Sequence, residues 1–250
     1  GEDVGNQTFQ DFFNDFGITE FPFEESLWCK ILKPEIPMVF LDTIHLNAKD
    51  STEFQKTRHL ESIFNEIEIK ITIEIIINLI SHAILEKFNL EHYERFFRNI
   101  GIITGYRAQN QQIRQYLREE IKNLFQMYQD LPVSTTLPIE DIVEIINENL
   151  IVDTVDRFQG QERELIIYNF VDSNRQAQLH KLNLEKRRLN VAISRAKKKI
   201  IFIGHTPTLT IQKSSLDSTV ITIKKLHKSL VDYIKNNQGY VALEPDLLLT

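Results

Sequence analysis

The sequence has little cysteine and no long apolar run. Cys29 is the single thiol among 250 residues, so an internal disulfide and a four-cysteine zinc site are both excluded. This usage fits a reducing compartment, and we expect the cytoplasm or nucleus. The most apolar stretch, residues 75–85, contains Asn78, Ser81 and His82. It is too short and too polar to cross a bilayer, so we expect no membrane partner.

Glycine is also scarce. No two of the eight glycines have the spacing of a phosphate-cradling Walker A loop, which needs a following Lys and Ser or Thr. The patterns His-Glu-x-x-His, Cys-x-x-Cys and Gly-x-Ser-x-Gly are absent too, so self-contained metal, redox or hydrolase chemistry has no support. The chain begins with Gly1 rather than Met, and we expect a fragment whose missing motifs lie outside it.

Positive charge is concentrated in one segment. The whole chain carries −6, but residues 181–199 hold eight basic residues against Glu185 alone. That segment is therefore +7 and the rest of the chain −13. The pattern fits a partner rich in phosphate, with a solvated helix face followed by a lysine-flanked strand as the alternative.

Apolar runs alternate with helical stretches along the chain. Strands buried on both faces are predicted at residues 38–41, 100–104, 151–155, 165–171 and 199–204. Helices are predicted at residues 107–128, 138–148, 183–197 and 224–237. This order predicts an α/β fold, a parallel sheet with helices on both faces and right-handed crossovers.

One segment is ambiguous. Residues 66–75 alternate strictly between polar and apolar types, which favours a strand. Residues 60–88 nevertheless look like one long helix, with isoleucine recurring every four residues. We expect a helix, because the connection between strands needs one.

The chain divides into three parts. Residues 1–36 are an aromatic-rich, irregular lead-in, expected to pack on the core or on a missing domain. Residues 37–205 form the main domain, with an inserted helical element at 119–150. Residues 206–250 are expected to pack on the main domain as a loop and a helix. Loops are predicted at residues 129–140, which contain two prolines, and at residues 205–219, which are rich in Thr and Ser.

Three stretches carry a chemical signal. Residues 154–162 (TVDRFQGQE) leave a strand through a loop whose Gly160 would let backbone approach a phosphate, and Glu162 could bind a ribose hydroxyl. Residues 187–197 (RRLNVAISRAK) place Arg188 and Arg195 two helical turns apart, a fork for phosphate oxygens. The alternatives are a tight turn and surface salt bridges.

The third stretch is residues 101–109 (GIITGYRAQ), where a strand ends and a helix starts. The Thr104 hydroxyl and free amides at a helix N-terminus can hold a phosphodiester, whereas Tyr106 could instead pack on the core.

In this order the three stretches resemble the second motor domain of superfamily 1 helicases, in the branch of the up-frameshift RNA helicase and senataxin. That family reads Val-Ile-Thr-Pro-Tyr-x-x-Gln, then Thr-Val-Asp-x-Phe-Gln-Gly-x-Glu, then Arg-Arg-Leu-Asn-Val-Ala-x-Thr-Arg-Ala-Lys. Weaker similarity lies at residues 40–43 and at Ser62, Asn65 and Glu68, which match a Ser-x-x-Asn-x-x-Glu helix start.

The resemblance implies a RecA-like fold and ATP-driven movement along single-stranded RNA or DNA. Arg195 would be the arginine finger, reaching the γ-phosphate of ATP that a first motor domain binds with Mg²⁺. Arg188 would support the same phosphates, and Gly160 and Glu162 would border the nucleotide.

The resemblance also implies a nucleic-acid track. Thr104 and Thr154 would touch the backbone, with Tyr106, Arg107 and Gln109 nearby. Such contacts would be tolerant of sequence and sensitive to salt.

The sequence departs from the family at several positions. Gly105 replaces the usual Pro, Ser194 replaces Thr, and Arg157 stands where a small residue is common. The Gln-Tyr-Arg motif that stacks on adenine is not found.

The favoured hypothesis is the C-terminal motor domain of an ATP-dependent helicase, inactive as this fragment alone. The alternatives are a non-catalytic nucleic-acid-binding scaffold that retains the fold, and an α/β interaction domain whose basic helix is plain surface.

Overall fold

The computed structural model describes most of the chain. The described residues are 8–18, 27–46, 52–57, 60–129, 137–158, 160–212 and 217–245. Parts of the predicted lead-in (1–7 and 19–26) and of the predicted loops (130–136 and 213–216) lie outside them, as does position 159.

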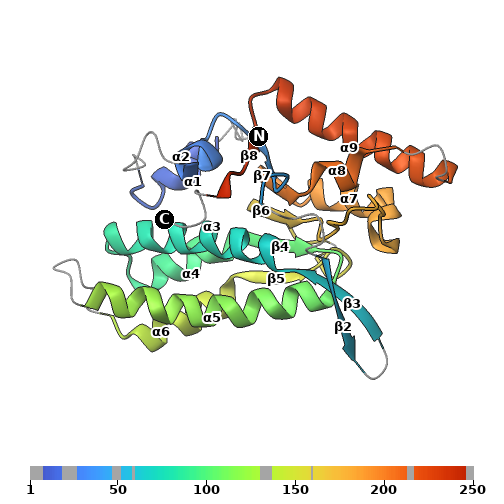
Figure 1. Ribbon diagram of the computed structural model, residues 1–250. Helices are drawn as coiled ribbons and strands as arrows, with labels where there is room; N and C mark the ends of the chain where they lie inside the picture. The colour runs from blue at the N-terminus through green and yellow to red at the C-terminus, as the bar shows by residue number, and fades with distance from the viewer. Residues whose placement is uncertain are drawn as a thin grey trace.

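A six-stranded, all-parallel sheet forms the centre of the molecule, with strand order β5-β4-β6-β7-β1-β8. Its strands are β1 (Met38–Asp42), β4 (Ile100–Thr104), β5 (Ile151–Thr154), β6 (Arg163–Asn169), β7 (Ala196–Gly204) and β8 (Tyr240–Ala242). An antiparallel hairpin of β2 (Thr52–Thr57) and β3 (Leu60–Asn65) lies at one side of the sheet (Figure 1). The predicted parallel α/β fold is confirmed.

Helices cover both faces of the sheet (Figure 1). One face is covered by α3 (Glu66–Leu85), α4 (Leu90–Arg98), α5 (Arg107–Gln129) and α6 (Ile139–Asn149). The other is covered by α7 (Lys186–Ile193), α8 (Thr206–Thr210) and α9 (Ser218–Asn236). The short helices α1 (Phe9–Asn14) and α2 (Leu27–Leu32) precede β1, and a 3₁₀ turn, η2 (Lys181–Leu184), precedes α7.

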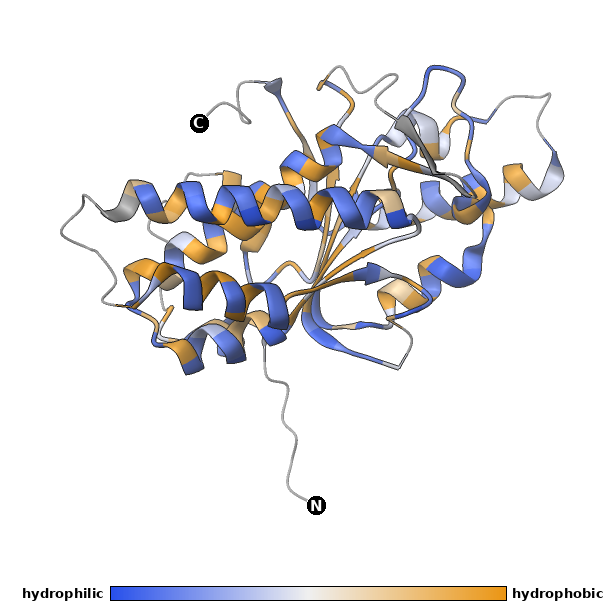
Figure 2. Cartoon of the chain, turned by 90° about the horizontal axis from the view of Figure 1, so that it is seen from below, coloured by the Kyte–Doolittle hydropathy of each residue, from blue (hydrophilic) through white to orange (hydrophobic). Residues whose placement is uncertain are grey.

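Two apolar cores result from the alternation of side chains along each strand. Val39 and Leu41 of β1 pack into the core beneath α3 and α5, whereas Phe40 packs into the core beneath α7 and α9. Figure 2 shows the consequence: the central strands are largely hydrophobic, and the helices are hydrophobic on one side only. Within the described residues, no helix combines the length and apolar character needed to cross a membrane.

The connection from β5 to β6 is short. Residues 155–162 connect the carboxyl end of β5 to the amino end of β6 and cross the neighbouring strand β4. Phe158 is fully buried in this crossover and lies directly against Gly101 of β4. A Cβ atom at position 101 would lie 2.5 Å from the Phe158 ring. Gly101 therefore lets the crossover pack closely on the sheet.

The ambiguous segment 66–75 is helical, as expected, within α3. The prediction that this helix starts at residue 60 is wrong, because residues 60–65 form β3. Asn65 sets the boundary: its side-chain oxygen accepts hydrogen bonds from the backbone N–H groups of Ile67 (3.1 Å) and Glu68 (3.2 Å), which caps the helix.

Three further expectations needed correction. The helix predicted at 183–197 is confined to α7, which ends at Ile193, and β7 begins at Ala196. The predicted loop 205–219 contains the short helix α8. Helix α4 and strand β8 were not expected, and β8 is only three residues long.

A buried lysine attaches the segment before β1 to the sheet. Lys199 of β7 has no solvent exposure. Its ammonium donates hydrogen bonds to the backbone carbonyls of Lys33 (2.9 Å) and Ile36, and lies 5.5 Å from the centre of the Phe9 ring. Burial lowers the pKa of Lys199 to about 7, and nearby Glu35 opposes that shift only in part.

This lysine makes stability depend on pH. Its pKa falls from 10.5 in the unfolded chain to about 7 in the folded one, so the unfolded state binds more protons between these values. Below about pH 7 Lys199 is charged in both states, and the cost of burying its charge lowers stability by its full amount. We expect the free energy of unfolding to rise with pH above that, by up to about 1.4 kcal/mol per unit relative to Lys199→Met. Urea denaturation of both proteins across this range measures the difference; parallel curves would contradict the assignment.

Candidate functional site

The predicted site residues divide between the two edges of the sheet. Because all six strands are parallel, their carboxyl ends share one edge and their amino ends the other. Thr104 ends β4 and Thr154 ends β5 at the carboxyl edge. Gly160 and Glu162 precede β6, and Arg195 precedes β7, at the amino edge. The chain therefore presents two separate candidate surfaces.

At the amino edge, Arg195 lies against the turn that contains Gly160. Its guanidinium donates to the backbone carbonyls of Gln161 (3.4 Å) and Val191 (3.3 Å) and to the hydroxyl of Ser194 (2.9 Å). All of these partners are neutral. Arg195 is partly exposed, so its charge faces solvent without a carboxylate among these contacts.

Gly160 needs the conformational freedom of glycine. Its φ of +84° lies in the left-handed region, and no atom would lie within 4 Å of an added Cβ. The space above the turn is therefore open. Glu162 is exposed beside it.

Arg163 is a basic residue of this edge that the motif comparison did not single out. Its guanidinium donates to the Glu162 carbonyl (2.7 Å) and to the Gln161 side chain (3.1 Å), and lies 5.6 Å from the centre of the Phe158 ring. Burial and the nearby charge of Arg98 lower its pKa. The only feature of the sequence that could have indicated Arg163 is its position directly after Gly160-Gln161-Glu162.

Arg188 does not share a surface with Arg195. Helix α7 runs back from the carboxyl edge towards the amino edge and ends before Arg195. Arg188, near the start of α7, forms ion pairs with Asp156 (2.8 Å) and Glu185 (2.9 Å). The predicted fork of two guanidiniums on one helix face is wrong, because the helix is too short to carry both.

At the carboxyl edge, the turn after β4 is covered. Thr104 is fully buried and its hydroxyl accepts a hydrogen bond from the Tyr106 N–H (3.2 Å). Tyr106 is also buried, and burial raises the pKa of its phenol. A Cβ at Gly105 would lie 3.3 Å from Leu182 of η2. Residues 170–185 therefore lie over this turn.

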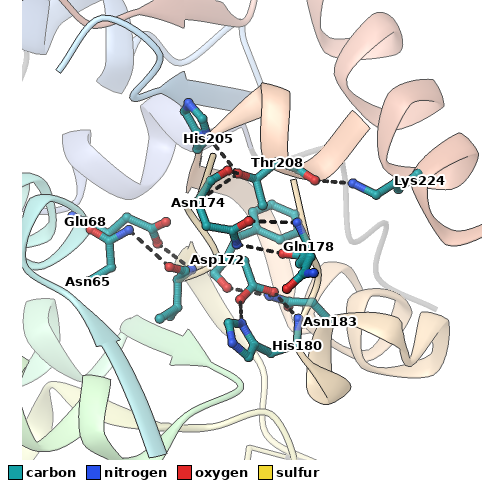
Figure 3. Close-up of polar contacts among 12 residues, drawn as sticks. Asn65, Glu68, Asp172, Asn174, Gln178, His180, Asn183, His205, Thr208 and Lys224 are labelled. Atoms are coloured by element: carbon teal, nitrogen blue, oxygen red, sulfur yellow. Dashed lines mark hydrogen bonds and ion pairs between the residues drawn. The ribbon is translucent and has the colours of Figure 1, made fainter. Parts of the chain in front are cut away.

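A polar network holds that covering segment in place (Figure 3). Asp172 is buried and accepts from the His180 ring, the His180 N–H (2.9 Å) and the Asn183 amide (2.7 Å). The carboxylate raises the pKa of His180. Val171 has a φ of +71°, unusual for a β-branched residue, and its N–H donates to Glu68 (2.9 Å).

Gln109 lies inside the chain rather than on its surface. Its amide oxygen accepts from the Asn65 N–H (2.8 Å), and its amide nitrogen donates to the Asn169 side chain (2.8 Å). Both ends of this buried side chain are engaged. Gln109 thus joins the starts of α3 and α5 to the end of β6.

Thr154 and Arg107 reach a groove outside the covered turn. Arg107 is exposed at the start of α5. Both residues line a groove of about 270 Å³ beside the edge strand β5. Of the five residues predicted to contact nucleic acid, Arg107 is exposed, and Thr154 is buried (8% exposed) but lines the groove.

The described residues contain no group of three or more His, Cys, Asp or Glu side chains that could hold a metal ion. A nucleotide phosphate, by contrast, fits the charge of Arg195 and the open turn at Gly160.

Comparisons with known proteins identify the family. The AAA domain family (AAA_12) matches residues 12–207. The chain is 35% identical over 187 residues to the DNA replication ATP-dependent helicase/nuclease DNA2 of Xenopus laevis, covering 74% of this chain and 14% of that protein. It is 30% identical over 179 residues to the DNA polymerase alpha-associated DNA helicase A of Saccharomyces cerevisiae, covering 70% and 20%.

A third relative is similar over a shorter part of the chain. The regulator of nonsense transcripts 1 homolog of Drosophila melanogaster is 33% identical over 138 residues, which cover 55% of this chain and 10% of that protein. The chain thus spans a fifth or less of each of these relatives. The chain belongs to the AAA domain family, the C-terminal RecA-like part of superfamily 1 helicases in the Upf1/DNA2 branch.

Proposed function

We propose that this chain is the second motor domain of an ATP-dependent nucleic-acid helicase, and that Arg195 is its arginine finger. The proposal rests on the guanidinium of Arg195, which lies beside the open Gly160 turn with neutral partners. ATP would be bound mainly by a first motor domain and would approach this chain at its amino edge.

The chemistry asked of Arg195 is electrostatic. Negative charge builds up on the transferred phosphoryl oxygens during hydrolysis, and a positioned guanidinium stabilises it. A carboxylate partner would neutralise that charge before the reaction, as Asp156 and Glu185 do for Arg188. The carbonyls around Arg195 orient the side chain and leave its charge available.

The other nucleotide contacts follow from the same edge. Gly160 would let the backbone approach the nucleotide, and Glu162 is exposed beside it as an acceptor for a ribose hydroxyl. Arg163 adds positive charge beneath the turn. For Arg188 we propose a supporting role, since its ion pair with Asp156 ties α7 to the crossover.

The carboxyl edge would carry the single strand. Thr154 and Arg107 line the groove beside β5 and are proposed to contact the phosphate backbone. Thr104, Tyr106 and Gln109 are buried beneath them, and we propose that they hold the turn in shape. Backbone contacts of this kind make binding tolerant of sequence and weaker at high salt.

The first test is Arg195→Ala in the complete parent protein, measured as steady-state ATP hydrolysis with saturating single-stranded nucleic acid. We expect kcat to fall by about 10³-fold or more, because the finger acts in the transition state. Binding of single strands without ATP should be unchanged. Arg187→Ala, which removes an exposed arginine of α7, the helix just before Arg195, is the matched control.

Hydrolysis that is unaffected by Arg195→Ala, with single-strand binding intact, would refute the finger and favour a non-catalytic binding module. ATPase activity of the isolated 250-residue chain would refute its dependence on a first motor domain.

The second test distinguishes a buried residue that supports the fold, Gln109, from an exposed residue that is proposed to contact nucleic acid, Arg107. Gln109→Ala leaves the buried Asn65 N–H without its partner and removes one contact of the Asn169 amide, which keeps its hydrogen bond with Thr72. We expect it to lower the free energy of unfolding by about 2–3 kcal/mol, since unpaired buried groups are costly. Arg107→Ala, exposed on the same helix, should change stability by less than about 0.5 kcal/mol while weakening single-strand binding. Urea denaturation measures the free energy of unfolding of both variants. Equal values for Gln109→Ala and Arg107→Ala would show that Gln109 does not support the fold.

A further inference from the structure

A basic groove lies beside β5, at the outer edge of the sheet. It is formed by one face of α5 and by the crossover that leaves β5. Its lining residues are Arg107, Asn110, Gln111, Arg114, Asp153, Thr154 and Arg157. With about 270 Å³ of space, it is smaller than a typical pocket for a drug-sized molecule, and it suits one phosphate with its sugar.

The charge of the lining is unbalanced. Three arginines face one carboxylate, that of Asp153. The nearest pairing is loose: Arg157 lies 3.9 Å from Asp153, and its side chain is 70% exposed. An exposed pair at this distance contributes little to stability, so the guanidinium is free to turn towards an anion.

Arg114 is positioned rather than mobile. Its guanidinium donates to the backbone carbonyl of Val152 (Nε, 3.2 Å), on the edge strand β5. A carbonyl partner orients the side chain without neutralising it. Asn110 also lines the groove and is 7% exposed.

The positive character ends further along α5. There the adjoining groove places Arg118 and Lys122 opposite carboxylates of α6, those of Glu140, Glu144 and Glu148. The stretch of α5 nearest Thr154 is therefore the part with excess positive charge. An extended polyanion would be attracted to this end of the helix alone.

We propose that this groove binds a backbone phosphate of single-stranded nucleic acid, with Arg157 and Arg114 as its guanidinium ligands. The inference rests on the proposed function, and extends the single-strand path outwards from Thr154 over the edge strand. Guanidinium groups match phosphate geometry and stay charged, so the contact is independent of base identity.

The experiment is fluorescence anisotropy of a labelled oligothymidine with the 250-residue chain, over a salt series. We expect Arg157→Gln to weaken binding about three- to tenfold at low salt and to reduce the salt slope by about 0.7, the value for one single-strand phosphate. Arg157→Lys should recover part of the affinity and part of the salt slope. Arg118→Gln, on α5 beyond the groove and opposite carboxylates, is the matched control and should leave the affinity and the salt slope unchanged.

The outcomes separate the two proposals. If Arg157→Gln binds like Arg118→Gln while Arg107→Ala weakens binding, Arg157 is not a phosphate ligand; the inference is then overturned and the proposed function stands. If the unmodified chain shows no salt-dependent binding, the proposed single-strand track is overturned together with this subsite. Weaker binding with an unchanged salt slope would mean that Arg157 acts through structure, which also overturns the inference.

Discussion

One backbone hydrogen bond sets the geometry of the amino edge. The Arg163 N–H donates to the Arg195 carbonyl oxygen (2.9 Å), just before β6 and β7 begin to pair. This bond places Arg195 opposite the residue that follows the Gly160 turn. The side chain of Arg195 then reaches the Gln161 carbonyl on the same short span of backbone. The candidate finger is therefore positioned by the register of the central sheet, which is the most deeply buried part of the molecule.

The basic segment 181–199 is not one surface in the folded chain. Lys197 and Lys198 lie within 4 Å of Glu164, and Lys199 is buried against the segment before β1. Arg188 is paired with carboxylates near the carboxyl edge. Little of the +7 counted in the sequence therefore acts as a common field, and the amino edge depends on Arg163 and Arg195. A count of charge along the chain overstates what any one ligand would meet.

The sheet could be predicted from sequence because its strands are buried on both faces and read as unbroken apolar runs. The amphipathic helices α5 and α6 were predictable for the same kind of reason. The extent of α7 was not, because Arg195 and the lysines that follow are good helix formers, and pairing with β6 overrides that preference. The start of α3 depends on Asn65, whose cap competes with a pattern that reads as helix from residue 60.

The accessibility of the site could not be predicted. Thr104, Tyr106 and Gln109 lie in a motif that reads as ligand-binding, yet they are buried because residues 170–185 fold over them. That covering depends on contacts such as Asn183 to Asp172, within a stretch that has no periodicity. Such contacts depend on tertiary position, which local pattern does not encode. Sequence pattern therefore indicated the candidate residues, whereas their burial depends on tertiary contacts that the pattern does not encode.

The two edges are connected by a continuous set of contacts. Thr154 ends β5, and its carbonyl accepts the N–H of Phe158, which shapes the crossover. Asp156 in that crossover pairs with Arg188 at the start of α7. Helix α7 is packed on the sheet through Leu189 and Ala192, both buried. Close-packed interiors transmit displacement rather than absorb it. The crossover and α7 therefore join the two candidate surfaces through packed contacts.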